Sequence, residues 1–183
     1  MMEPQSEPKQ LNDKPTRTIT FRVNSQVLAK LKDYARRDKS TVNALVNKIL
    51  LQAIEWNVIA AKSSLMPTER DVVKSILDNL DDETIVHIAQ RKGKTLPRDL
   101  CLSMHGSCEI NDWIDIIKLG SSVTGFDLAT MNDESGTVFV MRHNMGKKYS
   151  LHSSSFYKQA FKEFDCDAIF EASENTLVFK MPK

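Results

Sequence analysis

The chain has 183 residues, of which 41% are hydrophobic and 27% charged, a composition typical of a globular protein with one or two small domains. No apolar run approaches the roughly 20 residues that a membrane-spanning helix needs. The polar stretch up to Pro15 lacks the apolar core of a secretory signal. The three cysteines form no even disulfide framework, so we expect a reduced, cytoplasmic compartment and no membrane partner.

The charged side chains are distributed unevenly along the chain. Up to Lys62 there are 11 Lys and Arg and 6 Asp and Glu, which gives a net charge of +5 (11 − 6). From Ser63 onward there are 14 and 18, which gives −4 (14 − 18). A basic N-terminal part joined to an acidic remainder indicates that the N-terminal part binds a polyanion. Differences in net charge of this size also occur on ordinary solvated surfaces.

The first part of the chain is expected to hold an arm and a strand. Residues 1–15 contain three prolines and mostly polar side chains, which predicts a disordered arm. Residues 18–23 alternate between polar and apolar side chains, as in a strand with one buried face. The wet face holds Thr18, Thr20 and Arg22, and the buried face holds Ile19, Phe21 and Val23.

Two amphipathic helices are predicted after the strand. Asn24 or Ser25 is expected to cap the first helix, and Ser40 or Thr41 the second. In both segments the apolar side chains recur at helical spacing, which predicts one buried stripe on each helix. These side chains are Val27, Leu28, Leu31, Tyr34 and Ala35 in the first helix, and Val42, Leu45, Val46, Ile49, Leu50 and Ala53 in the second.

One short strand and two short helices are too small to bury a core by themselves. Below about 40 residues a chain usually needs a partner, a metal or disulfides. Two copies meet this need if their strands pair as an antiparallel ribbon, because the apolar faces of both strands then cover the four helices. The opposite face presents Thr18, Thr20 and Arg22 twice, and a two-stranded ribbon fits the major groove of DNA.

These residues resemble the Arc/MetJ/CopG ribbon-helix-helix regulators, and the resemblance covers residues 17–56. It implies an intertwined homodimer in which Thr18, Thr20 and Arg22 face the bases. It also implies that the N-terminus of the second helix, at Ser40, Thr41, Val42 and Asn43, anchors a DNA phosphate through backbone amides. The family often has a glycine in the turn between the helices, where this chain has Lys39.

Residues 67–183 are expected to form a separate C-terminal α+β domain that follows a ribbon-helix-helix domain at 16–62. Helices are predicted over about 67–80, 82–91, 97–104, 109–119 and 150–164, with a stop near Gly93. Strands are predicted over 126–131, 137–143, 168–172 and 176–181, the first two joined by a hairpin turn. From residue 109 the order matches a circularly permuted ferredoxin-like sandwich, an antiparallel sheet with helices on one face.

Two segments of this domain raise the question of a ligand. Cys101, His105 and Cys108 have a spacing that suits a metal, but a tetrahedral site needs a fourth ligand and none stands at a typical distance in the sequence. We therefore expect no metal and no cofactor. Lys147 and Lys148 join a strand to a helix and are a candidate anion site, although solvated lysines in a simple connection explain them as well.

The sequence favours a sequence-specific transcriptional regulator that binds double-stranded DNA as a homodimer or higher homo-oligomer, with an effector ligand that is unknown. No nucleophile elbow, phosphate loop or metalloprotease motif is present, so an enzyme is not expected. An antitoxin-like protein-interaction module and a metal-responsive repressor are the alternatives. The C-terminal region loosely resembles domains that follow ribbon-helix-helix heads in archaeal proteins of unassigned function, and this likeness implies no activity.

Overall fold

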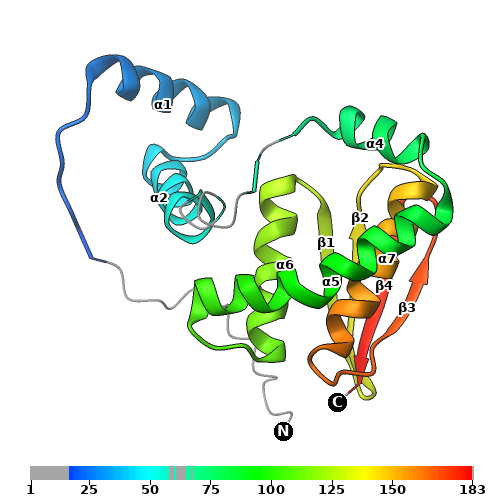
Figure 1. Ribbon diagram of the computed structural model, residues 1–183. Helices are drawn as coiled ribbons and strands as arrows, with labels where there is room; N and C mark the ends of the chain where they lie inside the picture. Colours follow the sequence, from blue (N-terminus) through cyan, green and yellow to red (C-terminus); the bar gives the residue numbers. More distant parts are fainter. Residues whose placement is uncertain (1–16, 58–59, 61–64, 67, 183) are drawn as a thin grey trace, which may run out of the picture. The chain divides into compact units, whose positions relative to one another are not determined.

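The computed structural model of the chain describes residues 17–57, 60, 65–66 and 68–182 (Figure 1). The predicted arm at 1–15 lies outside the described residues, as does Pro67. The described residues fall into two compact units, which divide between Val46 and Asn47. Each unit is described by itself below. Among the described helices, none has the length and apolar character needed to cross a membrane.

The two predicted helices are both formed, and the division between the units falls within the second of them. Helix α1 spans Ser25–Arg37, and helix α2 spans Val42–Gln52 and continues into a π-helical turn, η1, at Ala53–Asn57. The predicted strand at 18–23 is not formed in the single chain, where these residues run outside any sheet (Figure 1). A strand is defined by its pairing, and the partner that the sequence predicts for it is a second copy.

The C-terminal unit is a mixed helix-and-sheet domain. Its elements in chain order are α4 (Arg70–Asp78), α5 (Asp82–His105), α6 (Ile110–Thr124), β1 (Asp127–Asp133), β2 (Gly136–Arg142), α7 (Lys147–Lys162), β3 (Ile169–Ala172) and β4 (Thr176–Pro182). The four strands form one antiparallel sheet in the order β1-β2-β4-β3.

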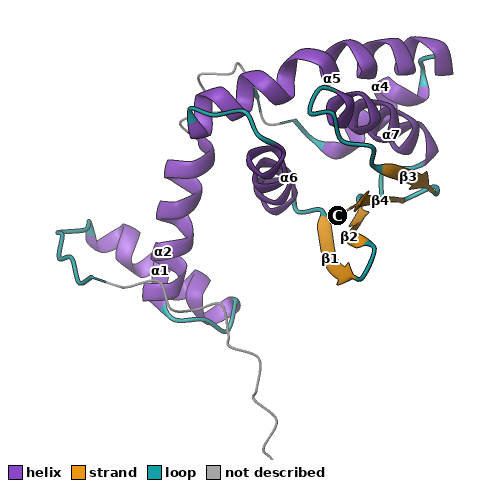
Figure 2. Ribbon diagram, turned by 90° about the horizontal axis from the view of Figure 1, so that it is seen from below, coloured by secondary structure: helices purple, strands orange, loops and turns teal. Residues whose placement is uncertain are grey.

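The core of the domain lies between one face of the sheet and the helices α6 and α7 (Figure 2). Phe139 of β2 and Phe179 of β4 stack with ring centroids 4.7 Å apart, and Phe161 of α7 lies 5.5 Å from Phe179. All three rings are at most 2% exposed. Helix α5 packs along α7 as an outer layer, so the single chain closes this core with its own elements.

Helix α5 corrects the sequence prediction of a stop near Gly93 and a new helix from Pro97. It runs unbroken for 24 residues through both positions. The reason is tertiary packing: a Cβ atom placed on Gly93 would lie 2.6 Å from the Phe156 carbonyl oxygen and 2.9 Å from Gln159 Cβ. Gly93 therefore lets α5 and α7 approach closely, and this contact outweighs the low helix propensity of glycine and proline.

Helix α7 also begins earlier than the predicted residue 150, at Lys147. Gly146 precedes it with a φ of +83°, a backbone conformation that suits glycine, and its N–H donates to Asn175 Oδ1 at 3.0 Å. The buried ring of His143 accepts the Met145 N–H on Nδ1 at 3.1 Å. These bonds turn the chain sharply after β2, so the helix starts three residues sooner.

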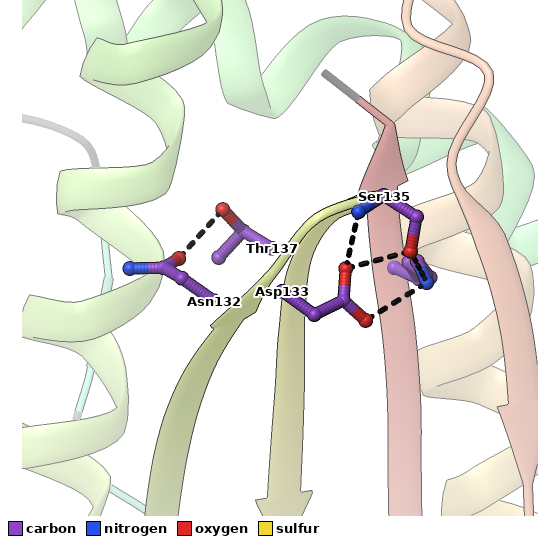
Figure 3. Close-up of polar contacts among 5 residues, drawn as sticks. Asn132, Asp133, Ser135 and Thr137 are labelled. Atoms are coloured by element: carbon purple, nitrogen blue, oxygen red, sulfur yellow. Dashed lines mark hydrogen bonds and ion pairs between the residues drawn. The ribbon is translucent and has the colours of Figure 1, made fainter.

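The hairpin between β1 and β2 is held by a polar network (Figure 3). One oxygen of Asp133 accepts from the N–H of Ser135 at 2.8 Å and from its hydroxyl at 2.6 Å. The other oxygen accepts from Lys180 of β4 at 3.2 Å, and Lys180 also donates to the Ser135 hydroxyl. The turn is thereby tied to β4, the neighbour of β2 in the sheet. The antiparallel pairing of β1 with β2 confirms the hairpin that the sequence predicts.

Candidate nucleic-acid interface

The side chains that the sequence places on the wet face of the predicted strand are exposed. Thr18, Thr20 and Arg22 all lie in the segment that precedes α1. Asn24 ends this segment as the N-cap of α1, because its Oδ1 accepts from the Gln26 N–H at 2.8 Å. The cap fixes the point at which the segment joins the helix, two residues after Arg22.

The side chains of the opposite face are exposed as well. Ile19 is 77% exposed, Phe21 54% and Val23 40%. In a folded protein such large apolar groups are usually covered, because removing each from water contributes roughly 1.5–3 kcal/mol. The exposure continues onto the helices, where the exposed large apolar residues are Val27, Leu28, Tyr34, Ile49, Leu50, Leu51 and Ile54.

In the turn between α1 and α2, this chain has Lys39 where the ribbon-helix-helix family that it resembles often has glycine. Lys39 has a φ of +50°, the left-handed conformation that glycine adopts most readily. The Ser40 N–H donates to the Ala35 carbonyl at 2.9 Å and the Asp38 N–H to the Tyr34 carbonyl at 2.9 Å, which closes the end of α1. Lys39 therefore takes up the backbone shape expected of glycine, at a cost of roughly 1 kcal/mol.

The N-terminus of α2 has the predicted cap. Thr41 Oγ1 accepts from the Ala44 N–H at 3.1 Å, and the Thr41 carbonyl accepts from Leu45 N–H at 3.0 Å. The structure thus brings Ser40, Thr41, Val42 and Asn43 together at the first turn of a capped helix. Such a turn presents backbone N–H groups and the positive end of the helix dipole, which suit a phosphate.

The other candidate residues lie in the C-terminal unit. Lys148 is engaged within the fold, where Nζ donates to the Leu80 carbonyl and to Asp82 Oδ1, both at 2.7 Å. Its charge is thereby used to join α7 to the start of α5. Lys147, its neighbour in the first turn of α7, is exposed. The two lysines therefore do not point to one shared anion site.

The cysteine and histidine residues of the candidate metal motif lie at the end of α5 and just beyond it. Cys101 is fully buried in the core, and burial raises the pKa of its thiol to about 12. Cys108 is half-buried against the same core. His105 Nδ1 lies 4.0 Å from Asp112 Oδ1. Cys101 is therefore held as a neutral thiol among apolar side chains.

A buried polar chain in the C-terminal unit was not anticipated from the sequence. Burial lowers the pKa of His143, which keeps its ring neutral. Since Nδ1 accepts a hydrogen bond, Nε2 carries the proton and donates to Ser150 Oγ at 2.9 Å, and Ser150 donates to the Glu174 carbonyl at 3.0 Å. Every member has a partner, so the chain joins β2, α7 and the β3–β4 turn. No sequence signal marks it, because the residues are seven and 24 positions apart.

Comparison with known proteins gives no family for this chain: no protein-family model and no curated protein sequence matches it.

Proposed function

We propose that the protein is a sequence-specific DNA-binding transcriptional regulator that acts as an intertwined ribbon-helix-helix dimer. The observation that carries the proposal is the exposed apolar face of the N-terminal unit. Ile19, Phe21 and Val23 alternate with polar side chains and are 40–77% exposed in the single chain. An alternating segment of this kind is complementary to a second copy of itself, which pairs with it as an antiparallel ribbon.

The ribbon accounts for both faces of the segment at once. Pairing covers the apolar face with the helices α1 and α2 of both copies and leaves Thr18, Thr20 and Arg22 on the outside. Arg is the side chain that most often reads a base, since it donates two hydrogen bonds to guanine in the major groove. The capped N-terminus of α2, at Thr41, supplies the phosphate contact that fixes the ribbon in the groove.

The C-terminal domain favours a regulator over an antitoxin-like partner module. Antitoxin tails are usually short, whereas this domain buries its own core between the sheet and the helices α6 and α7. We propose a permuted ferredoxin-like topology for it, supported by the strand order β1-β2-β4-β3. Its role in the regulator is to add homo-oligomer contacts or to bind an effector in the cytoplasm.

The test is a binding selection followed by a competition titration. Wild-type protein is used to enrich sequences from a random duplex pool, and the enriched duplex is then compared with random DNA for the wild type and for Arg22→Ala. We expect Arg22→Ala to reduce the preference for the enriched duplex by roughly tenfold or more, because each lost bidentate pair discriminates by about 1–3 kcal/mol.

Arg36→Ala is the matched control, because it removes the same charge from α1, where Arg36 pairs with Asp33 at 2.9 Å. It should leave the preference unchanged. A selection that enriches no sequence, or an Arg22→Ala variant with the wild-type preference, would show that the ribbon is not the reading head.

A further inference from the structure

The cations of the C-terminal domain divide into two groups according to their contacts. One group is engaged: a side chain in this group pairs with a carboxylate or donates to a backbone carbonyl. This group contains Arg70, Lys74, Lys118, Arg142, Lys148 and Lys180. The second group is exposed and has no ion pair or hydrogen bond with any other described residue. It contains Arg91, Lys92, Lys94, Arg98, Lys147, Lys158 and Lys162.

Three of these unengaged cations form a stripe on α5. Arg91, Lys94 and Arg98 are three and four residues apart, so they share one face of the helix. No Asp or Glu stands three or four residues from any of them, although such pairs are the usual way to stabilise an exposed helix. Like charges at this spacing destabilise the helix, so the stripe has no evident benefit for the fold.

Helix α7 carries a second pair on the same side of the domain. Lys158 and Lys162 are one turn apart and exposed. A hollow of about 400 Å³ is lined by Gln90 of α5 together with Lys158 and Lys162. None of the three stripe residues lines the hollow, but Gln90 lies one turn before Lys94 on α5, so Gln90 connects the stripe with the lysine pair along one flank of the α5–α7 layer.

The neighbouring carboxylates leave this flank positive. Glu163 accepts a hydrogen bond from Gln159 Nε2 at 2.6 Å, Asp167 lines the hollow with the two lysines, and the exposed Asp99 follows Arg98 on α5. None of these carboxylates forms an ion pair with a cation of the stripe or of the lysine pair. The five cations therefore make a local positive surface on a domain whose net charge from Ser63 onward is −4 (14 − 18). We name the surface of Arg91, Lys94, Arg98, Lys158 and Lys162 the α5–α7 cationic surface.

We propose that the α5–α7 cationic surface binds the phosphate backbone of double-stranded DNA. An acidic domain attached to a DNA-reading head is repelled by the duplex unless one of its faces is positive. The seven-residue step from Arg91 to Arg98 rises about 10 Å along the helix, so the three long side chains are spread along one line that can follow the phosphates of a DNA backbone. The inference rests on the proposed function, because it adds backbone contacts outside the ribbon.

The experiment compares the full-length wild type with the triple variant Arg91→Gln, Lys94→Gln, Arg98→Gln on random duplex DNA at several salt concentrations. Each phosphate contact contributes about 0.9 to the slope of log affinity against log salt. Three contacts in each of two subunits therefore make the slope of the variant shallower by about 5. We expect the affinity at low salt to fall at least tenfold, and the preference for the enriched duplex to stay unchanged, because phosphates carry no sequence information.

The matched control is the triple variant Lys74→Gln, Lys118→Gln, Arg142→Gln. It removes the same three charges from side chains that are already paired with Asp78, Asp115 and Asp127. The control should keep the wild-type salt slope. Thermal unfolding of the α5 variant should show no loss of stability, since the substitutions remove like-charge repulsion within one helix.

The outcomes separate this proposal from the one on which it rests. If the wild type binds no duplex at low salt, DNA binding itself is wrong. If the wild type binds and Arg22→Ala loses the sequence preference, but the α5 variant keeps the wild-type slope, the cationic surface is not a DNA contact. An equal loss in the control would attribute the effect to net charge and would also overturn the assignment.

Discussion

The two units of the chain differ in how far their apolar side chains are exposed. In the C-terminal unit, Phe139, Phe161 and Phe179 are at most 2% exposed, and elements of the same chain cover them. In the N-terminal unit, Ile19 is 77% exposed and Phe21 54%, although their alternation with polar residues is as regular as that of a core strand. The C-terminal unit is complete as a single chain, whereas the N-terminal unit has the pattern of a core without the surface that would cover it.

The difference follows from size and from element order. The C-terminal unit has four strands, which form a sheet large enough for α6 and α7 to cover one face. Residues 17–57 offer one candidate strand and two helices, and the one apolar side chain that the structure describes as buried among them is Ala35. Small units expose a large share of their surface, so a second copy is the simplest source of the missing layer.

The strongest test of this comparison is to separate the units. We expect fragment 1–62 to have no stable folded monomer, so its thermal midpoint should rise with protein concentration. Fragment 67–183 should unfold at a midpoint that does not depend on concentration, because its core is closed by its own elements. Circular dichroism melts over a hundredfold concentration range, with sedimentation to give the mass, make the measurement. A monomeric 1–62 fragment with a fixed midpoint would contradict the proposed dimer.

A second test concerns how tightly the C-terminal unit is packed. Gly93→Ala places a methyl group 2.6 Å from the Phe156 carbonyl oxygen, so α5 and α7 must move apart. We expect the free energy of unfolding to fall by about 1–3 kcal/mol. Gly120→Ala in α6 is the control: a Cβ there meets nothing within 4 Å, and alanine should stabilise the helix by roughly 0.5–1 kcal/mol. Equal effects of the two substitutions would contradict the close approach at Gly93.

A third test concerns the helix cap of the N-terminal unit. Thr41→Ala removes the hydroxyl that accepts the Ala44 N–H, and we expect a loss of about 1 kcal/mol in the free energy of unfolding. Affinity for the enriched duplex and for random DNA should fall by the same factor, because the phosphate contact carries no sequence information. Thr41→Ser, which keeps the hydroxyl, should restore both. A change in sequence preference would mean that Thr41 lies close to a base.

The smallest expected effect is a pH dependence in the β1–β2 hairpin. Hydrogen bonds from the Ser135 hydroxyl and N–H, and then from Lys180, lower the pKa of Asp133 to about 2. A lowered carboxyl pKa contributes stability that is present above the unfolded value of about 3.9 and is lost as the pH falls toward 2. A carboxyl titration by NMR should show this pKa in the wild type and a higher one in Ser135→Ala. An Asp133 that titrates near 3.9 in both would contradict the network.

The sequence predicted the elements best where periodicity and local caps act together. The helices α1 and α2, the Asn24 and Thr41 caps and the β1–β2 hairpin are all confirmed, whereas the predicted buried stripes of α1 and α2 stay largely exposed in the single chain. Each depends on residues within a few positions of one another, which a single sequence displays. The predicted break in α5 is wrong, because the contact of Gly93 with α7 is set by residues more than 60 positions away.

The candidate site rests on local patterns as well. Thr18, Thr20 and Arg22 follow from alternation, and since both faces of their segment are exposed in the single chain, the wet face stays a prediction. The hydrogen-bonded chain from His143 to Glu174 and the engagement of Lys148 with Asp82 were not predictable, since both join segments distant in sequence. The α5–α7 cationic surface was not predictable from the sequence for the same reason. It becomes visible only when the packing of α5 on α7 is known.

The exposed apolar face of the N-terminal unit also bears on the life of a newly made chain. Ile19 and Phe21 leave the ribosome early, before the C-terminal domain is synthesised. If the ribbon needs two chains, these side chains stay in water until two molecules meet, and they attract chaperones or proteases in the meantime. Halving the cellular dose would then lower the amount of the proposed dimer by more than half. Any activity that needs the dimer would respond steeply to the number of copies.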